Sequence, residues 1–171
     1  MTWTLRLAKS LDEQMHADLH RPHTFAAERV GVLYTRTSLA SGTTLILAAE
    51  YRPLDDGDYV DDPTVGAHIG SSGIRKIMQA ILDEGYGALH VHSHGGLGRP
   101  RFSGVDLREL PGLIRSFRAV NRDMPHGALL LSADQCNALV WLPGEAGPSL
   151  GGSITIVGFP TVIAETGGLY A

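Results

Sequence analysis

Three histidines at alternate positions, followed by a serine and an aspartate, form the part of this sequence best suited to chemistry. His90, His92 and His94 are separated by single residues, and Ser103 and Asp106 follow a glycine-rich stretch. Side chains two residues apart lie on the same face of a β-strand, so His92 and His94 point the same way if this segment is extended. Two imidazoles and a carboxylate form a three-ligand set that leaves a fourth position on zinc for water. The spacing therefore predicts a catalytic zinc site with His92, His94 and Asp106 as ligands.

Each half of this pattern also has a simpler interpretation. A histidine on a strand is usually a core or surface residue, and Ser103-x-x-Asp106 is typical of a capped helix N-terminus. His90 and His92 also form a rival pair of ligands at the same spacing. A residue that caps a helix can still bind a metal, so the two interpretations are compatible. The proximity of the two halves favours the metal site.

Local patterns predict the elements that position these residues. Residues 88–91 are typical of a buried strand, which follows a helix that carries an apolar stripe and ends at Gly85. Another helix is expected after Asp106, where Pro111 interrupts the helical period and predicts a kink or two short helices. These segments indicate an α/β fold. Further strands are expected at residues 2–7, 30–35, 43–49, 128–131, 138–142 and 154–157, with a helix at 11–20.

The composition is that of a globular protein. The chain has 171 residues, of which 43% are hydrophobic and 19% charged, and this predicts a single domain over residues 1–171. The net charge of −4 argues against a broad nucleic-acid surface. Cys136 is the single cysteine, which we interpret as an inert thiol in a reducing compartment. No signal-peptide pattern and no membrane-spanning run is found, so we expect a cytoplasmic location without a membrane partner.

The segment His92-Ser93-His94, followed by Ser103-x-x-Asp106, resembles the JAMM motif of the JAB/MPN metalloprotease family. These proteins are zinc isopeptidases that remove ubiquitin and ubiquitin-like proteins. The family also has an upstream glutamate before a strand of the form Glu-x-x-Gly-x-Leu, and Glu28-Arg29-Val30-Gly31-Val32-Leu33 matches that form. The resemblance spans residues 25–117. Two departures affect the loop: Gly95 stands where the family usually has proline, and the eight residues between His94 and Ser103 are one more than usual.

The resemblance implies a single three-layer JAB/MPN-like domain, with a mixed β-sheet flanked by helices. It implies Glu28 as the general base and Ser103 as a donor to the oxyanion, with His92, His94 and Asp106 on the zinc ion. Glu50, at the end of a predicted strand, competes with Glu28 for the role of base. We favour Glu28 because the glycine three residues later and the apolar strand match the family pattern. His90 then becomes a buried group that could orient a ligand.

The resemblance also implies an activity and a set of partners. The forms His-x-His-x-His-Gly and Pro-x-Phe-Ser are similar to bacterial members found beside E1-like and E2-like proteins. The expected activity is zinc-dependent cleavage of a ubiquitin-like protein from its conjugate or precursor. One alternative is a zinc peptidase that processes a sulfur-carrier or other small precursor protein. Another is a non-catalytic scaffold of the same fold. The complete set of glutamate, histidines, serine and aspartate argues against a scaffold, which has no need of it.

An acidic stretch offers a candidate substrate surface. Such a run is usually just solvated, but family members use an insertion here to hold the tails of ubiquitin-like proteins, which often carry arginine. Two arginines flank the expected cleft and join the candidates. The residues proposed for substrate binding are Asp55, Asp56, Asp58, Arg99 and Arg101, and the acidic stretch continues to Asp61 and Asp62.

Overall fold

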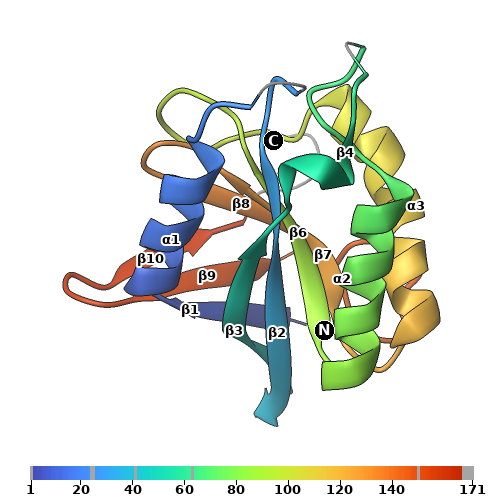
Figure 1. Ribbon diagram of the computed structural model, residues 1–171. Helices are drawn as coiled ribbons and strands as arrows, with labels where there is room; N and C mark the ends of the chain where they lie inside the picture. The colour runs from blue at the N-terminus through green and yellow to red at the C-terminus, as the bar shows by residue number, and fades with distance from the viewer. Residues whose placement is uncertain (1, 24–25, 41, 63, 150, 167–171) are drawn as a thin grey trace.

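A mixed eight-stranded β-sheet lies at the centre of the computed structural model, and helices cover both of its faces (Figure 1). The structure describes residues 2–23, 26–40, 42–62, 64–149 and 151–166. Helix α1 (Lys9–Leu19) packs on one face, and α2 (Ser71–Glu84) and α3 (Gly104–Val120) pack on the other. In spatial order the strands are β10 (Val162–Glu165), β9 (Gly152–Val157), β1 (Thr2–Ala8), β3 (Thr43–Pro53), β2 (Val30–Ala40), β6 (Gly87–Ser93), β7 (His126–Leu131) and β8 (Cys136–Trp141).

The α/β class and the mixed sheet expected from the sequence are confirmed. Strands β2 and β3 extend further than expected, to Ala40 and Pro53, because each supplies hydrogen-bond partners to the other along an antiparallel ladder. Of the kink or two short helices expected after Asp106, the two short helices are wrong: α3 is one helix with Pro111 inside it. Its buried face, formed by Leu110, Ile114 and Phe117, packs on the sheet and offsets the lost amide hydrogen bond.

Four small elements were not expected from local patterns. A 3₁₀ turn (Asp56–Asp58) leads into β4 (Tyr59–Val60), which pairs with β5 (His68–Ile69) as a separate two-stranded sheet. Strand β10 adds an edge to the main sheet beside β9. Among the described residues, no helix combines the length and the apolar character needed to cross a membrane.

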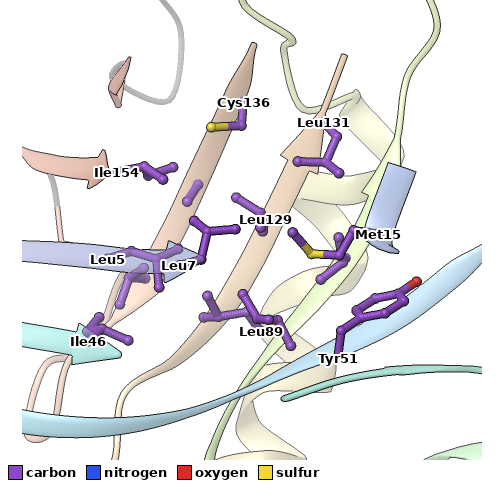
Figure 2. Packing of buried hydrophobic residues seen from close by; sticks show 14 of the residues in the cluster. Leu5, Leu7, Met15, Ile46, Tyr51, Leu89, Leu129, Leu131, Cys136 and Ile154 are labelled. Atoms are coloured by element: carbon purple, nitrogen blue, oxygen red, sulfur yellow. The ribbon is translucent and has the colours of Figure 1, made fainter. Parts of the chain in front are cut away.

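Strand β6 separates two different environments. Leu89 and Val91 belong to the apolar cluster on the α1 face, where Met15 of α1 and Leu129 of β7 point into the same space (Figure 2). The intervening residues of β6 point to the face covered by α2 and α3, as the two-residue period of a strand requires. The apolar half of the strand is therefore anchored in the core while its histidines face the opposite layer.

The pairing of β2 with β6 carries a distant segment to these histidines. The two strands are antiparallel, and Val30, the first residue of β2, pairs with His92. Continuing this register two residues beyond the strand places Glu28 opposite His94. A residue more than sixty positions away in the sequence is thereby brought beside the histidines.

A close contact between β2 and β3 fixes this region of the sheet. A Cβ atom on Gly31 would overlap the ring of Tyr51, which crosses over it from β3. The Tyr51 hydroxyl donates to Asp18 Oδ2 of α1 at 2.6 Å, and burial together with this bond raises the pKa of Tyr51. Tyr51 is 3% exposed and bonded at its tip, so its ring has little freedom to move aside.

Gly31→Ala should therefore lower the free energy of unfolding by about 1–3 kcal/mol, the usual cost of overpacking a core. Urea denaturation of the purified protein measures this difference. Gly57→Ala is the matched control, because a Cβ at Gly57 meets no atom of the described residues within 4 Å. Equal unfolding midpoints for the two variants would contradict the assigned packing of Tyr51.

Candidate metal centre

Four side chains from three distant segments converge at one end of the sheet. The ring centroids of His92 and His94 lie 5.1 Å apart. One ligand atom from each of Glu28, His92 and His94 lies within 4.8 Å of the other two. Asp106 approaches from α3, with Oδ1 3.3 Å from Nε2 of His92 and Oδ2 3.6 Å from Nε2 of His94. Two imidazoles and two carboxylates thus face one another.

Asp106 is held in place at the N-terminus of α3. The Ser103 amide donates to Asp106 Oδ2 at 2.7 Å, and the Asp106 amide donates to Ser103 Oγ at 3.1 Å, which completes the capping box that the sequence indicated. Burial raises the pKa of the Asp106 carboxyl, but the adjacent His92 ring and the Ser103 hydrogen bonds lower it by more, so the net pKa lies below the usual range. The carboxylate is therefore ionised at neutral pH.

His94 is oriented by a backbone carbonyl. Its Nδ1 lies 3.1 Å from the carbonyl oxygen of Arg101. Because a carbonyl only accepts hydrogen bonds, this contact selects the neutral tautomer with the proton on Nδ1 and the lone pair on Nε2. Nε2 is the atom that faces Glu28 and Asp106. Metal-binding histidines commonly have this arrangement, with one nitrogen bonded to an outer acceptor and the other directed at the metal.

His92 lacks the partners that a purely structural histidine would have. It is 2% exposed, yet neither ring nitrogen forms a hydrogen bond with any described residue. An unpaired buried polar group costs roughly 1–3 kcal/mol. In contrast, the buried His126 in the neighbouring strand accepts from the Ala88 amide at Nδ1 and donates to the Asn121 carbonyl from Nε2. Nε2 of His92 instead faces Asp106 Oδ1 at 3.3 Å without hydrogen-bond geometry, an arrangement that fits a nitrogen directed at a metal.

The distances distinguish the two carboxylates. Ligand atoms on a tetrahedral zinc with bonds of about 2.1 Å lie about 3.4 Å apart. Asp106 Oδ1 lies 3.3 Å from Nε2 of His92, and its Oδ2 lies 3.6 Å from Nε2 of His94, so each imidazole has an Asp106 oxygen at about this separation. Glu28 Oε1 is 4.0 Å from Nε2 of His94, and one oxygen of Glu28 forms a compact group with the two histidines. The residues present therefore fit a metal ion held by His92, His94 and a carboxylate, and the shorter distances favour Asp106 as that carboxylate, with Glu28 beside it.

Glu50 has a different environment from Glu28. It lies inside β3, where Arg52 donates to its two carboxylate oxygens at 2.6 and 2.8 Å. The bond to Arg52 also lowers the pKa of Glu50. Of the two glutamates considered from the sequence, the structure brings only Glu28 to the histidines.

His90 shares the strand face of His92, but no carboxylate of the described residues lies within ion-pair distance of its ring. The two ring centroids are 5.1 Å apart, and Nδ1 of His90 forms no hydrogen bond within the described part of the chain. Burial lowers the pKa of His90 to about 3, which keeps the ring neutral at physiological pH. The convergence of Asp106 on the other two histidines favours His92 and His94 as the pair. A role for His90 in orienting a ligand stays a prediction.

A cleft with a volume of about 730 Å³ opens over these residues. One wall is the segment 64–69, and the other is the exposed side of α3. This volume lies within the range of about 300–1,000 Å³ that is typical of ligand sites. No lysine or arginine lines it among the described residues, whereas four carboxylates do: those of Glu28, Asp62, Asp106 and Glu109. The lining of the cleft is therefore acidic.

The acidic residues predicted to bind substrate lie outside the lining of this cleft. Lys76 donates to Asp55 at 2.9 Å and to Asp58 at 2.7 Å. Arg29 donates to Asp56 at 2.9 Å, and this bond lowers the pKa of Asp56. These ion pairs connect the acidic loop to α2 and to the start of β2. A role of these aspartates in substrate binding stays a prediction.

The two predicted arginines are not part of the cleft lining either. The Arg99 side chain donates to the backbone carbonyl of Glu165 near the end of β10. Arg101 contributes its carbonyl to His94, as described above, and its side chain is exposed. Binding of substrate by either arginine also stays a prediction.

One segment of the site was missed in the sequence. Residues 64–68 line the cleft, and Gly66 lies directly against the carboxylate of Glu28. No local pattern identifies this segment, because its role depends on where the chain returns to the start of β2. Asp62, the last residue of the acidic stretch considered from the sequence, also lines the cleft.

The fold and the site define a class: a mixed α/β protein with a candidate metal centre, where two histidines and a glutamate form a group that could hold a metal ion and an aspartate lies against both histidines. Neither a protein-family model nor a curated protein matches this chain. The arrangement of side chains therefore carries the functional argument.

We expect the purified protein to bind one zinc ion per chain. His92→Ala and Asp106→Ala should each abolish zinc binding, because each variant lacks one of the three proposed ligands. Elemental analysis after dialysis measures the metal content. His90→Ala is the matched control on the same strand and should retain zinc. Loss of zinc from His90→Ala, with zinc retained in His94→Ala, would show that His90 and His92 are the histidine ligands instead.

Proposed function

We propose that this protein is a JAB/MPN-type zinc isopeptidase or peptidase that cleaves a ubiquitin-like protein from its conjugate or precursor. The observation that carries the proposal is the convergence of Glu28, His92, His94 and Asp106 around one point, with Ser103 at the adjoining helix cap. The resemblance to the JAMM motif was drawn from the sequence, and the spatial convergence is independent support for it. The three-layer JAB/MPN-like domain is part of the same proposal.

The metal has one chemical contribution in this scheme. When bound, zinc acts as a Lewis acid and lowers the pKa of water from about 15.7 to about 7. His92, His94 and Asp106 hold it. Asp106 is suited to this because its carboxylate stays ionised at neutral pH.

Glu28 supplies the proton transfers. Its carboxylate, 4.0 Å from Nε2 of His94, accepts a proton from the attacking water and returns it to the leaving amine. One third of the Glu28 side chain is exposed, so solvent and substrate can reach it from the cleft. No other glutamate among the described residues belongs to the cluster around the histidines.

Ser103 donates a hydrogen bond to the oxyanion. Its Oγ accepts from the Asp106 amide through a lone pair, so the hydroxyl hydrogen remains to donate into the cleft. A donor directed at the developing negative charge stabilises the transition state more than the ground state. Ser103 acts here without becoming a nucleophile.

The substrate proposal rests on the size and charge of the cleft. A space of about 730 Å³ between segment 64–69 and α3 can admit a segment of a peptide chain. Its carboxylates favour basic residues or a lysine ammonium near the scissile bond. A C-terminal tail of a ubiquitin-like protein joined to a lysine has this character.

Cleavage should depend on metal and be independent of thiol chemistry. The assay uses a panel of ubiquitin-like proteins, each with a C-terminal peptide extension or a lysine conjugate. A chelator should abolish cleavage, and added zinc should restore it. A thiol-blocking reagent should have no effect, because Cys136 is buried and burial raises its pKa to about 12. Cleavage that survives chelation but not thiol blockade, or no cleavage of any panel member, would contradict the proposal.

Glu28→Gln should lower kcat by about 10²–10⁴, the range associated with loss of a general base. Zinc content and melting temperature should stay close to those of the parent protein. Glu50→Gln is the matched control, since it makes the same change in a glutamate paired with Arg52 on β3. Single-turnover cleavage measures both variants. An active Glu28→Gln together with an inactive Glu50→Gln would reverse the assignment, and loss of zinc from Glu28→Gln would make Glu28 a ligand.

A further inference from the structure

The carboxylate of Glu28 lies directly against Gly66. A Cβ atom placed on Gly66 would be 2.8 Å from Cδ, 2.9 Å from Oε2 and 3.0 Å from Oε1 of Glu28. Ordinary contacts of a Cβ atom lie at 3.4–4 Å. The carboxylate therefore occupies the space that a side chain at position 66 would need.

Backbone contacts prevent the two segments from moving apart. The Glu28 amide donates to the Gly66 carbonyl at 3.0 Å. The loop that carries Gly66 is tied at Asp62, whose carboxylate accepts from the Thr64 amide at 3.0 Å and hydroxyl at 2.6 Å, and lies 3.1 Å from Nδ1 of His68. The distance between Gly66 and the Glu28 backbone is thus set by the fold.

The need for glycine at position 66 is one of space, because its φ lies outside the left-handed region. An alanine can adopt such a backbone conformation without strain. What an alanine adds here is a methyl group against the carboxylate of Glu28.

We propose that Gly66 is a positioning residue for the general base: its missing side chain lets the Glu28 carboxylate rest beside Nε2 of His94. This inference rests on the proposed function, because it assigns Gly66 a role through Glu28. Gly66 itself contacts neither the histidines nor Asp106 in this role. It sets where the carboxylate can lie.

The effect of a methyl group at position 66 falls on the side chain of Glu28. The backbone bond between the two residues keeps the loop in place, while the Glu28 side chain can rotate at little cost. Relief of the close contacts requires a displacement of several tenths of an ångström to about 1 Å. Displacements of about 1 Å in a catalytic group can reduce the rate about 10²-fold.

Gly66→Ala should therefore lower kcat by roughly 10–100-fold and leave KM, zinc content and melting temperature near those of the parent protein. Gly147→Ala is the matched control. Gly147 lies outside the cleft lining, and a Cβ there meets no atom of the described residues within 4 Å. Gly147→Ala should keep full activity. A crystal structure of zinc-loaded Gly66→Ala should show the Glu28 carboxylate displaced relative to His94, a readout that needs no substrate.

A double-mutant cycle separates positioning from a general structural effect. In the Glu28→Gln background, Gly66→Ala should cost no further activity, because the carboxylate it displaces is already gone. An additive loss in the double variant, or an unshifted carboxylate in the crystal, would overturn the inference. If Glu28→Gln alone is fully active, the proposed function fails. If Glu28→Gln is inactive and Gly66→Ala equals the parent protein, only the role of Gly66 fails.

Discussion

The antiparallel register between β2 and β6 is the constraint on which the candidate centre depends. It pairs Val30 with His92 and so carries Glu28, just before the strand, to the position opposite His94. A shift of one residue would turn the side chains of β2 to the other face of the sheet. The register is held by apolar residues of β2 that point to both layers, with Leu33 in the α1-face core and Val30 and Val32 in the other.

Strand β6 uses its two faces for different purposes. Leu89 and Val91 anchor it in a dry core, and this anchoring fixes the direction of the imidazoles on the opposite face. Groups held on a packed strand are positioned more accurately than groups on a free loop. His94 lies just beyond the strand but is held as firmly. Its amide donates to the Leu131 carbonyl at 2.9 Å, and its ring is oriented by the Arg101 carbonyl.

Asp106 caps α3 and is also a candidate metal ligand. Oδ2 accepts from the Ser103 amide at the start of α3, while Oδ1 lies nearest to His92. Helix capping and metal binding do not compete here, because a carboxylate has two oxygens with several lone pairs. The same cap leaves the Ser103 hydroxyl hydrogen available. The N-terminus of α3 thus delivers two side chains to the site through one local motif.

The features that the sequence alone determined are those with local causes. The two-residue period of a strand put His92 and His94 on one side, and the Ser103-x-x-Asp106 spacing specified a capped helix start, which the structure contains. The α/β class and most strands and helices were predicted from hydrophobic periodicity and from residues that end helices. Gly85, for example, ends α2 in the left-handed conformation. Local pattern left open whether Pro111 kinks one helix or divides it into two, and the structure contains one helix because packing against the sheet outweighs a local helix breaker.

The features that only the tertiary structure decided depend on contacts between distant segments. Local patterns left Glu28 and Glu50 as competitors, and the β2–β6 register brought Glu28 to the histidines while Arg52 paired with Glu50. The acidic loop looked like free surface charge, yet Lys76 and Arg29 bind its aspartates. The contact between Gly66 and Glu28 has no sequence signal at all. Periodicity and capping act over a few residues, whereas strand register, ion pairing and close packing are settled only when the whole chain has folded.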